Sequence, residues 1–249
     1  MRYFFIFLCA LSFACCNHTE QASPLRVTAA ANLQFPIQDI TAAFTKKTNI
    51  PCETIIGSSG KLTAQIKEGA PYDIFISANQ LYPNTLHQAG RTTSPPVVIG
   101  EGKLVLLHLT ESIELEALLN PNIKHIAIAN PKVAPYGAAA MEVLKNQEGL
   151  YEKIEHKIVY GESIAQVNQF VATGVADVGF TALSAVIALQ KKQKSFWTEI
   201  NTKDHSPIKQ TMVLLKNNRN KTAEAKQFQD FILSSDGKSI LKKYGYIVD

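Results

Sequence analysis

Apolar residues along this chain follow two alternating periods. Short segments in which nearly every residue is apolar are separated by segments in which apolar residues recur every three or four positions. The first pattern is typical of strands buried on both faces, and the second of helices with one buried face. In the N-terminal part the pattern predicts strands at 25–30, 52–57 and 72–78 and helices at 35–48 and 60–69.

The same alternation restarts further along the chain. Strands are predicted at 103–109, 124–130, 156–161 and 176–182, and helices at 113–120, 136–149 and 163–174. Apolar strands separated by helices predict parallel sheets covered by helices, so we expect an α/β protein with two such units.

The C-terminal part has no complete α/β unit of its own. One strand is predicted at 207–217 and two helices within 222–245, with a turn at 234–237. We therefore expect this part to cross back and complete the first unit, giving two lobes, each a mostly parallel sheet flanked by helices. The expected boundaries are 24–104 and 208–249 for lobe 1 and 105–207 for lobe 2.

The N-terminus has the pattern of an export signal. Arg2 precedes an apolar run of about 12 residues, which suits a secretory signal and is well short of the ~20 needed to span a bilayer. We interpret 1–23 as a signal peptide and linker, which places the mature protein in the periplasm. Two interpretations stay open: release as a free protein, or a lipid anchor through Cys15 or Cys16.

The remaining composition excludes several classes of protein. The net charge of +4 is modest and the 25 lysines and arginines are scattered, so no nucleic-acid partner is expected. The histidines form neither an H-x-H nor an H-E-x-x-H arrangement, and no site for a free metal cation is predicted. Cys52 is alone in the mature chain, so we interpret it as a small buried apolar residue.

One short motif is compatible with an enzyme. Ser58 and Lys61 have the S-x-x-K spacing of the nucleophile and base in penicillin-recognising serine enzymes. The companion S-D-N and K-T-G sequences are absent from the chain. A serine hydrolase is therefore only a less favoured alternative, and no catalytic residue is assigned.

Four loops between a predicted strand and a predicted helix consist of small or hydroxylated residues. They lie at 30–32, 57–60, 134–137 and 161–163. Each places unpaired backbone N–H groups and the positive end of a helix dipole in a loop, where an anion can bind. One such loop alone is an ordinary helix start, but four at the carboxyl edges of two facing sheets would surround one crevice. None of the four ranges contains Lys, Arg or His, although Lys61 directly follows the second, and this indicates an anion held by neutral donors.

At these residues the chain resembles the periplasmic molybdate-binding proteins of ABC importers, the ModA family. The resemblance covers nearly the whole mature chain and is most specific at SSGKLTAQIKEGAPYDIFISAN; the other matching stretches are RVTAAANL, IAIANPKVAPYGAAAMEVL, GESIAQVNQFVATGVADVGFTALSAV and KKYGY. It implies a type II periplasmic-binding-protein fold, whose two lobes close on one dehydrated tetrahedral oxyanion in the cleft between them. No covalent chemistry is implied.

The resemblance also implies which residues contact the ligand. Position by position these are Ala31, Asn32, Ser59, Tyr136 and Ile164, with Ser58 and Ser163 as secondary candidates. Side chains are expected to donate at Asn32 and Ser59, and backbone N–H groups at the other positions. Some members supply a ligand tyrosine where this chain has Ala182, so Tyr136 or Asn32 replaces that hydroxyl or the pocket makes one contact fewer.

The ligand implied by the resemblance is molybdate, or tungstate, which has nearly the same size. A monomer without a cofactor, delivering its ligand to an inner-membrane ABC permease, is expected. A receptor for sulfate or phosphate is the near alternative. A smaller oxyanion cannot reach every donor of a molybdate site, and unpaired buried donors cost about 1 to 3 kcal/mol each. A phosphate site is expected to add an acidic acceptor, and the only carboxylate in the four loops is Glu162.

Overall fold

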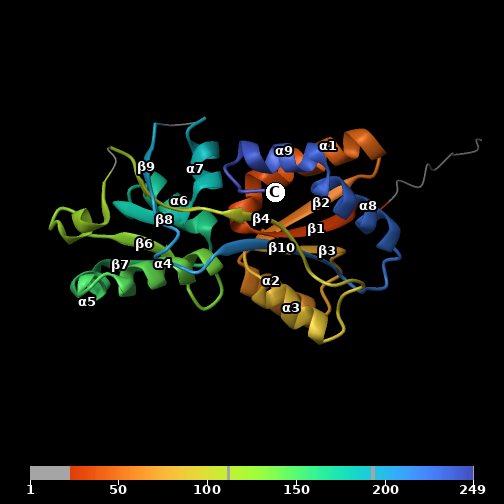
Figure 1. Ribbon diagram of the computed structural model, residues 1–249, viewed down its shortest axis with the longest axis horizontal. Coiled ribbons are helices and arrows are strands. Elements are labelled where there is room, and N and C mark those ends of the chain that lie inside the picture. Colours follow the sequence, from red (N-terminus) through yellow and green to blue (C-terminus); the bar gives the residue numbers. More distant parts are fainter. Residues whose placement is uncertain (1–22, 111–112, 192–193, 249) are drawn as a thin grey trace, which may run out of the picture.

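The computed structural model describes residues 23–110, 113–191 and 194–248 (Figure 1). Two five-stranded sheets, each with helices packed against it, lie next to each other along the longest axis of the molecule. The interpretations of the signal peptide and of Cys15 and Cys16 concern positions outside the described ranges. Within those ranges, no helix has both the length and the apolar character needed to cross a bilayer.

The first lobe is built on a sheet with the strand order β2-β1-β3-β10-β4. Its strands are β1 (Leu25–Ala30), β2 (Cys52–Gly57), β3 (Ile74–Ser77), β4 (Val97–Gly102) and β10 (Ile208–Leu214). Its helices are the 3₁₀ turn η1 (Ala31–Leu33), α1 (Gln34–Thr48), α2 (Ser59–Lys67), α3 (Leu81–Gln88), α8 (Thr222–Leu233) and α9 (Ser235–Lys243). Helices α1, α8 and α9 lie on one side of the sheet and α2 and α3 on the other (Figure 1).

The second lobe is built on a sheet with the order β7-β6-β8-β5-β9. Its strands are β5 (Leu104–His108), β6 (Ile126–Ala129), β7 (Ile158–Gly161), β8 (Val178–Ala182) and β9 (Phe196–Glu199). Its helices are η2 (Leu115–Leu119), α4 (Pro135–Asn146), α5 (Leu150–Ile154), η3 (Glu155–Lys157), α6 (Ile164–Ala172) and α7 (Leu183–Leu189).

Each sheet has one strand that runs against the other four, so both sheets are mostly parallel, as expected, but not entirely so. In the first sheet β1 runs parallel to β2 and β3, whereas β10 is antiparallel to β3 and β4. In the second, β6 runs parallel to β7 and β8, whereas β5 is antiparallel to β8 and β9. The antiparallel pairs all involve β5 or β10. Each of these is the first strand that the chain forms after it crosses from one lobe to the other.

The chain passes between the lobes in two segments. β4 ends at Gly102 and β5 begins at Leu104, so the first crossing is at Lys103, and the second runs from Glu199 to Ile208. Leu104, which the sequence analysis places in the first lobe, begins the ladder of β5 with β8, opposite Ala182.

Helix α7 joins the two lobes by packing. It directly follows β8 of the second sheet, yet Ala188 is buried in the core of the first lobe with Ile37 and Phe44. Cys52, expected to be a buried apolar residue, is half-buried at the edge of the same core.

Candidate functional site

One small cavity lies between the lobes at the carboxyl ends of β1, β2, β6 and β7. The residues that line it are Ala30, Ala31, Asn32, Ser58, Ser59, Ala78, Ala134, Pro135, Tyr136, Ser163 and Ile164. All of the primary and secondary candidates named from the sequence are among them. The structure therefore brings the four loops together around one cavity.

Four helix starts converge on this cavity. Helices α2, α4 and α6 begin at Ser59, Pro135 and Ile164, and η1 leads from Ala31 into α1. None of these four starts has a side-chain cap, although serines precede two of them. Their first-turn N–H groups have no intrahelical acceptors, so those that are not bonded elsewhere, as the Gly60 N–H is to the Val133 carbonyl, are available to an anion in the cavity.

Two serine hydroxyls add to these backbone donors. Ser59 Oγ accepts a hydrogen bond from the Ala78 amide at 3.1 Å, which leaves its own proton free to donate into the cavity. Ser58 Oγ is buried and has no hydrogen-bond partner among the described residues. An unpartnered buried hydroxyl is uncommon and often marks a site for a ligand or water.

The side chain of Asn32 is held from behind the cavity. Its Nδ2 donates to Gln210 Oε1 and to the Tyr246 hydroxyl, both at 2.8 Å. Gln210 donates its own Nε2 to the Ile208 carbonyl at 2.9 Å, which fixes which atom of its amide faces Asn32. Both side-chain N–H bonds of Asn32 are thus used within the protein. The side chain therefore has no N–H left for a ligand, in contrast to the expected side-chain donor, and we expect the backbone N–H of Asn32 to serve the cavity instead.

The Tyr136 hydroxyl is directed towards the first crossing. It is fully buried, has no hydrogen-bond partner among the described residues, and lies so close to Gly102 that a Cβ there would be 2.0 Å away. Burial, with smaller effects of Tyr246 and Glu101, raises the pKa of Tyr136 well above its usual value despite an opposing effect of Asn32. Because the hydroxyl lies against Gly102, which is outside the cavity lining, the geometry does not favour it as the replacement for the missing tyrosine contact.

The position of that missing tyrosine, Ala182, is itself not part of the lining. Ala182 is fully buried in the second sheet, opposite Leu104. Of the three alternatives left open by the sequence, the geometry therefore favours a pocket that makes one contact fewer.

None of the residues that line the cavity is charged. The nearby Lys61 ammonium lies outside the lining and pairs with Glu162 of the second lobe at 2.7 Å, with both side chains exposed. A serine hydrolase would need Lys61 within hydrogen-bond reach of Ser58, whereas the Ser58 hydroxyl has no partner in the described part of the chain. The S-x-x-K spacing therefore does not form a nucleophile–base pair in this structure.

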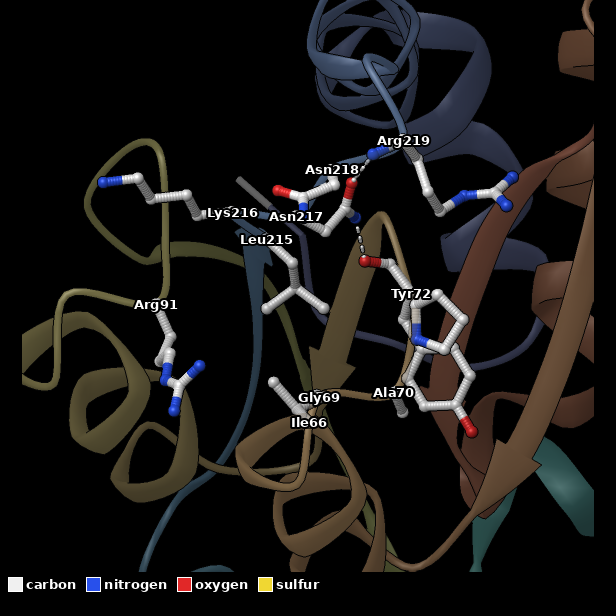
Figure 2. Close-up of a pocket in the computed structure, with 11 residues that line it drawn as sticks. Ile66, Gly69, Ala70, Tyr72, Arg91, Leu215, Lys216, Asn217, Asn218 and Arg219 are labelled. Carbon is white, nitrogen blue, oxygen red and sulfur yellow. Dashed lines mark hydrogen bonds between the residues drawn. The ribbon is translucent and has the colours of Figure 1, made fainter.

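A larger cavity, of about 400 Å³, lies at the other edge of the first sheet, where β3 begins (Figure 2). Its wall is the segment after β10, where Asn217 Nδ2 donates to the Tyr72 carbonyl and Arg219 Nε pairs with Asp73 at 3.1 Å. Arg91 and Lys216 also line it, but none of the four loops does. We interpret it as an open groove beside a structural ion pair, separate from the candidate site.

Comparison with known proteins gives consistent results. Residues 25–247 match the family described as bacterial extracellular solute-binding protein. The molybdate-binding protein ModA of Rhodobacter capsulatus is 40% identical over 223 residues, which are 88% of this chain and 86% of that protein. ModA of Azotobacter vinelandii is 37% identical over 230 residues, which are 91% and 90% of the two chains. The solved structure of the Azotobacter vinelandii periplasmic molybdate-binding protein superposes with a TM-score of 0.84 at 32% identity, covering 90% of this chain and 99% of that one.

Proposed function

The chain belongs to the family of bacterial extracellular solute-binding proteins, and we propose that it is the receptor for molybdate and tungstate of an ABC importer. The observation that carries the proposal is the convergence of four uncapped helix starts on one cavity without charged lining residues. The molybdate-binding relatives support the choice of ligand. In this proposal the protein acts as a monomer in the periplasm and delivers its ligand to a membrane permease.

A buried dianion needs dense hydrogen bonding when no cation accompanies it. In this site the donors are the first-turn N–H groups and the hydroxyls of Ser58 and Ser59. Each hydrogen bond to a charged group contributes about 1.5 to 3 kcal/mol. Neutral donors and helix dipoles together are therefore sufficient to hold an oxyanion without Lys or Arg.

The same donors select against other oxyanions. Sulfate is smaller than molybdate, so it cannot reach all of the donors at once, and each buried donor left unpaired costs about 1 to 3 kcal/mol. Hydrogen phosphate carries a proton that requires an acceptor, and the lining contains no carboxylate. Tungstate has almost the size of molybdate and is expected to bind similarly.

Calorimetric titration of the protein with molybdate, tungstate, sulfate and phosphate tests the proposal. We expect tight one-to-one binding of molybdate and tungstate, and binding of sulfate and phosphate that is weaker by about tenfold or more. Sulfate or phosphate binding as tightly as molybdate would contradict it. Absence of molybdate binding to the folded protein would also contradict it.

A further inference from the structure

A buried hydrogen-bond network lies directly behind the cavity. At its centre is the hydroxyl of Tyr246, a residue of the C-terminal segment that is only 4% exposed. This hydroxyl accepts from Asn32 Nδ2 at 2.8 Å and lies 3.1 Å from both the Asn32 carbonyl and Ser184 Oγ. Ser184 Oγ in turn donates to the Asn32 carbonyl at 2.7 Å.

The network holds Asn32 at two points. Tyr246 and Ser184 surround its carbonyl oxygen, and Tyr246 and Gln210 accept from its side-chain amide. Holding both groups fixes the backbone torsions of Asn32, and therefore the direction of its N–H, which lies at the cavity. Donors that are fixed before a ligand arrives bind it more tightly, because less conformational entropy is lost on binding.

The network also connects both lobes with the first crossing. Tyr246 and Asn32 belong to the first lobe, whereas Ser184 lies in the first turn of α7, just after β8 of the second. The residue after Tyr246, Ile247, exchanges two backbone hydrogen bonds with Glu101, at 2.8 and 2.9 Å, one residue before β4 ends. Two adjacent residues near the C-terminus are therefore bound, one to β4 just before the crossing and the other to a loop that lines the cavity.

We propose that Tyr246 is a positioning residue for anion binding: its hydroxyl orients the Asn32 backbone towards the cavity and ties that loop to the second lobe through Ser184. This inference rests on the proposed function and deepens it. Tyr246 contacts no ligand itself, since it is not part of the lining. Its influence on the anion passes through Asn32.

The test compares Tyr246→Phe with Tyr244→Phe, a control from the same C-terminal segment. The Tyr244 hydroxyl donates to Asp39 Oδ2 at 2.9 Å, away from Asn32, so both substitutions remove one tyrosine hydroxyl, but only Tyr246→Phe removes contacts with Asn32 and Ser184. Molybdate affinity is measured by calorimetry, and thermal unfolding is measured without anion. We expect Tyr246→Phe to weaken molybdate binding about 3- to 10-fold. Tyr244→Phe is expected to leave the affinity unchanged.

A double-mutant cycle with Ser184→Ala separates positioning from general stability. Ser184→Ala is expected to weaken molybdate binding as well, and the two substitutions together are expected to weaken it by less than the product of their separate effects. If Tyr246→Phe does not fold, Ser184→Ala alone tests the inference.

Three outcomes would overturn the inference while wild-type protein binds molybdate. One is wild-type affinity in Tyr246→Phe with only a lower unfolding temperature, and another is equal weakening by Tyr244→Phe. The third outcome is wild-type affinity in Ser184→Ala, which decides the question if Tyr246→Phe does not fold. A wild-type protein that binds no molybdate would instead overturn the proposed function, on which this inference rests.

Discussion

The backbone N–H of Gly60, in the first turn of α2, donates to the carbonyl of Val133 in the opposite lobe at 2.8 Å. Beside it the Tyr82 hydroxyl donates to the Lys132 carbonyl, again across the lobes, at 3.2 Å. The helix that presents Ser59 to the cavity therefore also holds the lobes together next to it. The structure is thus that of a closed receptor.

Gly60→Ala is predicted to oppose this closure. A Cβ at Gly60 would lie 2.9 Å from Val133 Cα and 2.8 Å from the Tyr82 hydroxyl, and the backbone of Val133 cannot yield without moving its loop. Overpacking of this kind costs about 1 to 3 kcal/mol, which predicts molybdate binding weaker by about 5- to 100-fold. Calorimetry measures the loss, and small-angle scattering with molybdate present should show a larger radius of gyration than for wild type.

Ala64→Ser, on the exposed face of the same helix, is the matched control because it also adds one heavy atom. It should bind molybdate like the wild type. Wild-type affinity and a wild-type radius of gyration in Gly60→Ala would contradict the prediction, because the closed lobes would then have space for a Cβ at Gly60.

Ser58→Ala and Ser59→Ala are predicted to weaken molybdate binding but to differ in stability. Loss of a donor to a charged group corresponds to about 10- to 100-fold in affinity for each. Ser59 Oγ accepts from the Ala78 amide, so Ser59→Ala should also lower the unfolding temperature without anion. Ser58 Oγ has no partner to lose, so Ser58→Ala should maintain or raise it. Unchanged affinity in both variants would mean that these loops are ordinary helix starts.

Arg219→Met is predicted to destabilise the fold without changing the site. Asp73 is 2% exposed, and Arg219 Nε contacts both of its carboxylate oxygens, at 3.1 and 3.2 Å. Removing one partner of such a buried pair costs about 3 kcal/mol or more, measurable by urea unfolding. Lys216→Met, on the same groove but exposed, should cost little. Equal stability of the two variants would argue against a structural role for the pair.

The thiol of Cys52 is predicted to react slowly in the folded protein. Burial raises its pKa from 9.0 to about 11, although a hydrogen bond with Thr45 opposes the shift. At pH 8 alkylation by iodoacetamide should therefore be at least about tenfold slower than in urea. Mapping the alkylated peptides by mass spectrometry distinguishes Cys52 from the three cysteines near the N-terminus. Equal rates in the two states would contradict the shift.

The same shift has a consequence for stability. Because the folded pKa of Cys52 is the higher one, the protonated thiol favours the fold below about pH 9, and this contribution is lost between about pH 9 and 11. Cys52→Ala should therefore reduce the fall in the free energy of unfolding across that range. An identical slope in the variant would show that other groups cause the fall.

The elements predicted correctly are those whose apolar residues follow one clear pattern, either continuous or on one helical face. β1 and β3 are apolar and buried along nearly their whole length, and α6 has one apolar face. α7 was missed because LSAVIAL is apolar all round, and it lies buried between the lobes. The direction of β10 was not predictable because it depends on where the chain re-enters the lobe.

The candidate site was partly predictable for a similar reason. Its four loops depend on local sequence, on small residues placed before a helix, and these loops do line one cavity. The role of the Asn32 side chain was not local. Its partners Gln210 and Tyr246 lie 178 and 214 positions further along the chain, and no pattern around Asn32 points to them.

The placement of β10 between β3 and β4 determines the order in which the protein can be completed. Strands β5 to β9 of the second lobe form one continuous segment, from Leu104 to Glu199, whereas the first sheet remains split until β10 has been synthesised. A growing chain can therefore finish the second lobe while the first still presents two unpaired, apolar strand edges. A ribosome that stalls before residue 208 would release an aggregation-prone fragment rather than a smaller receptor.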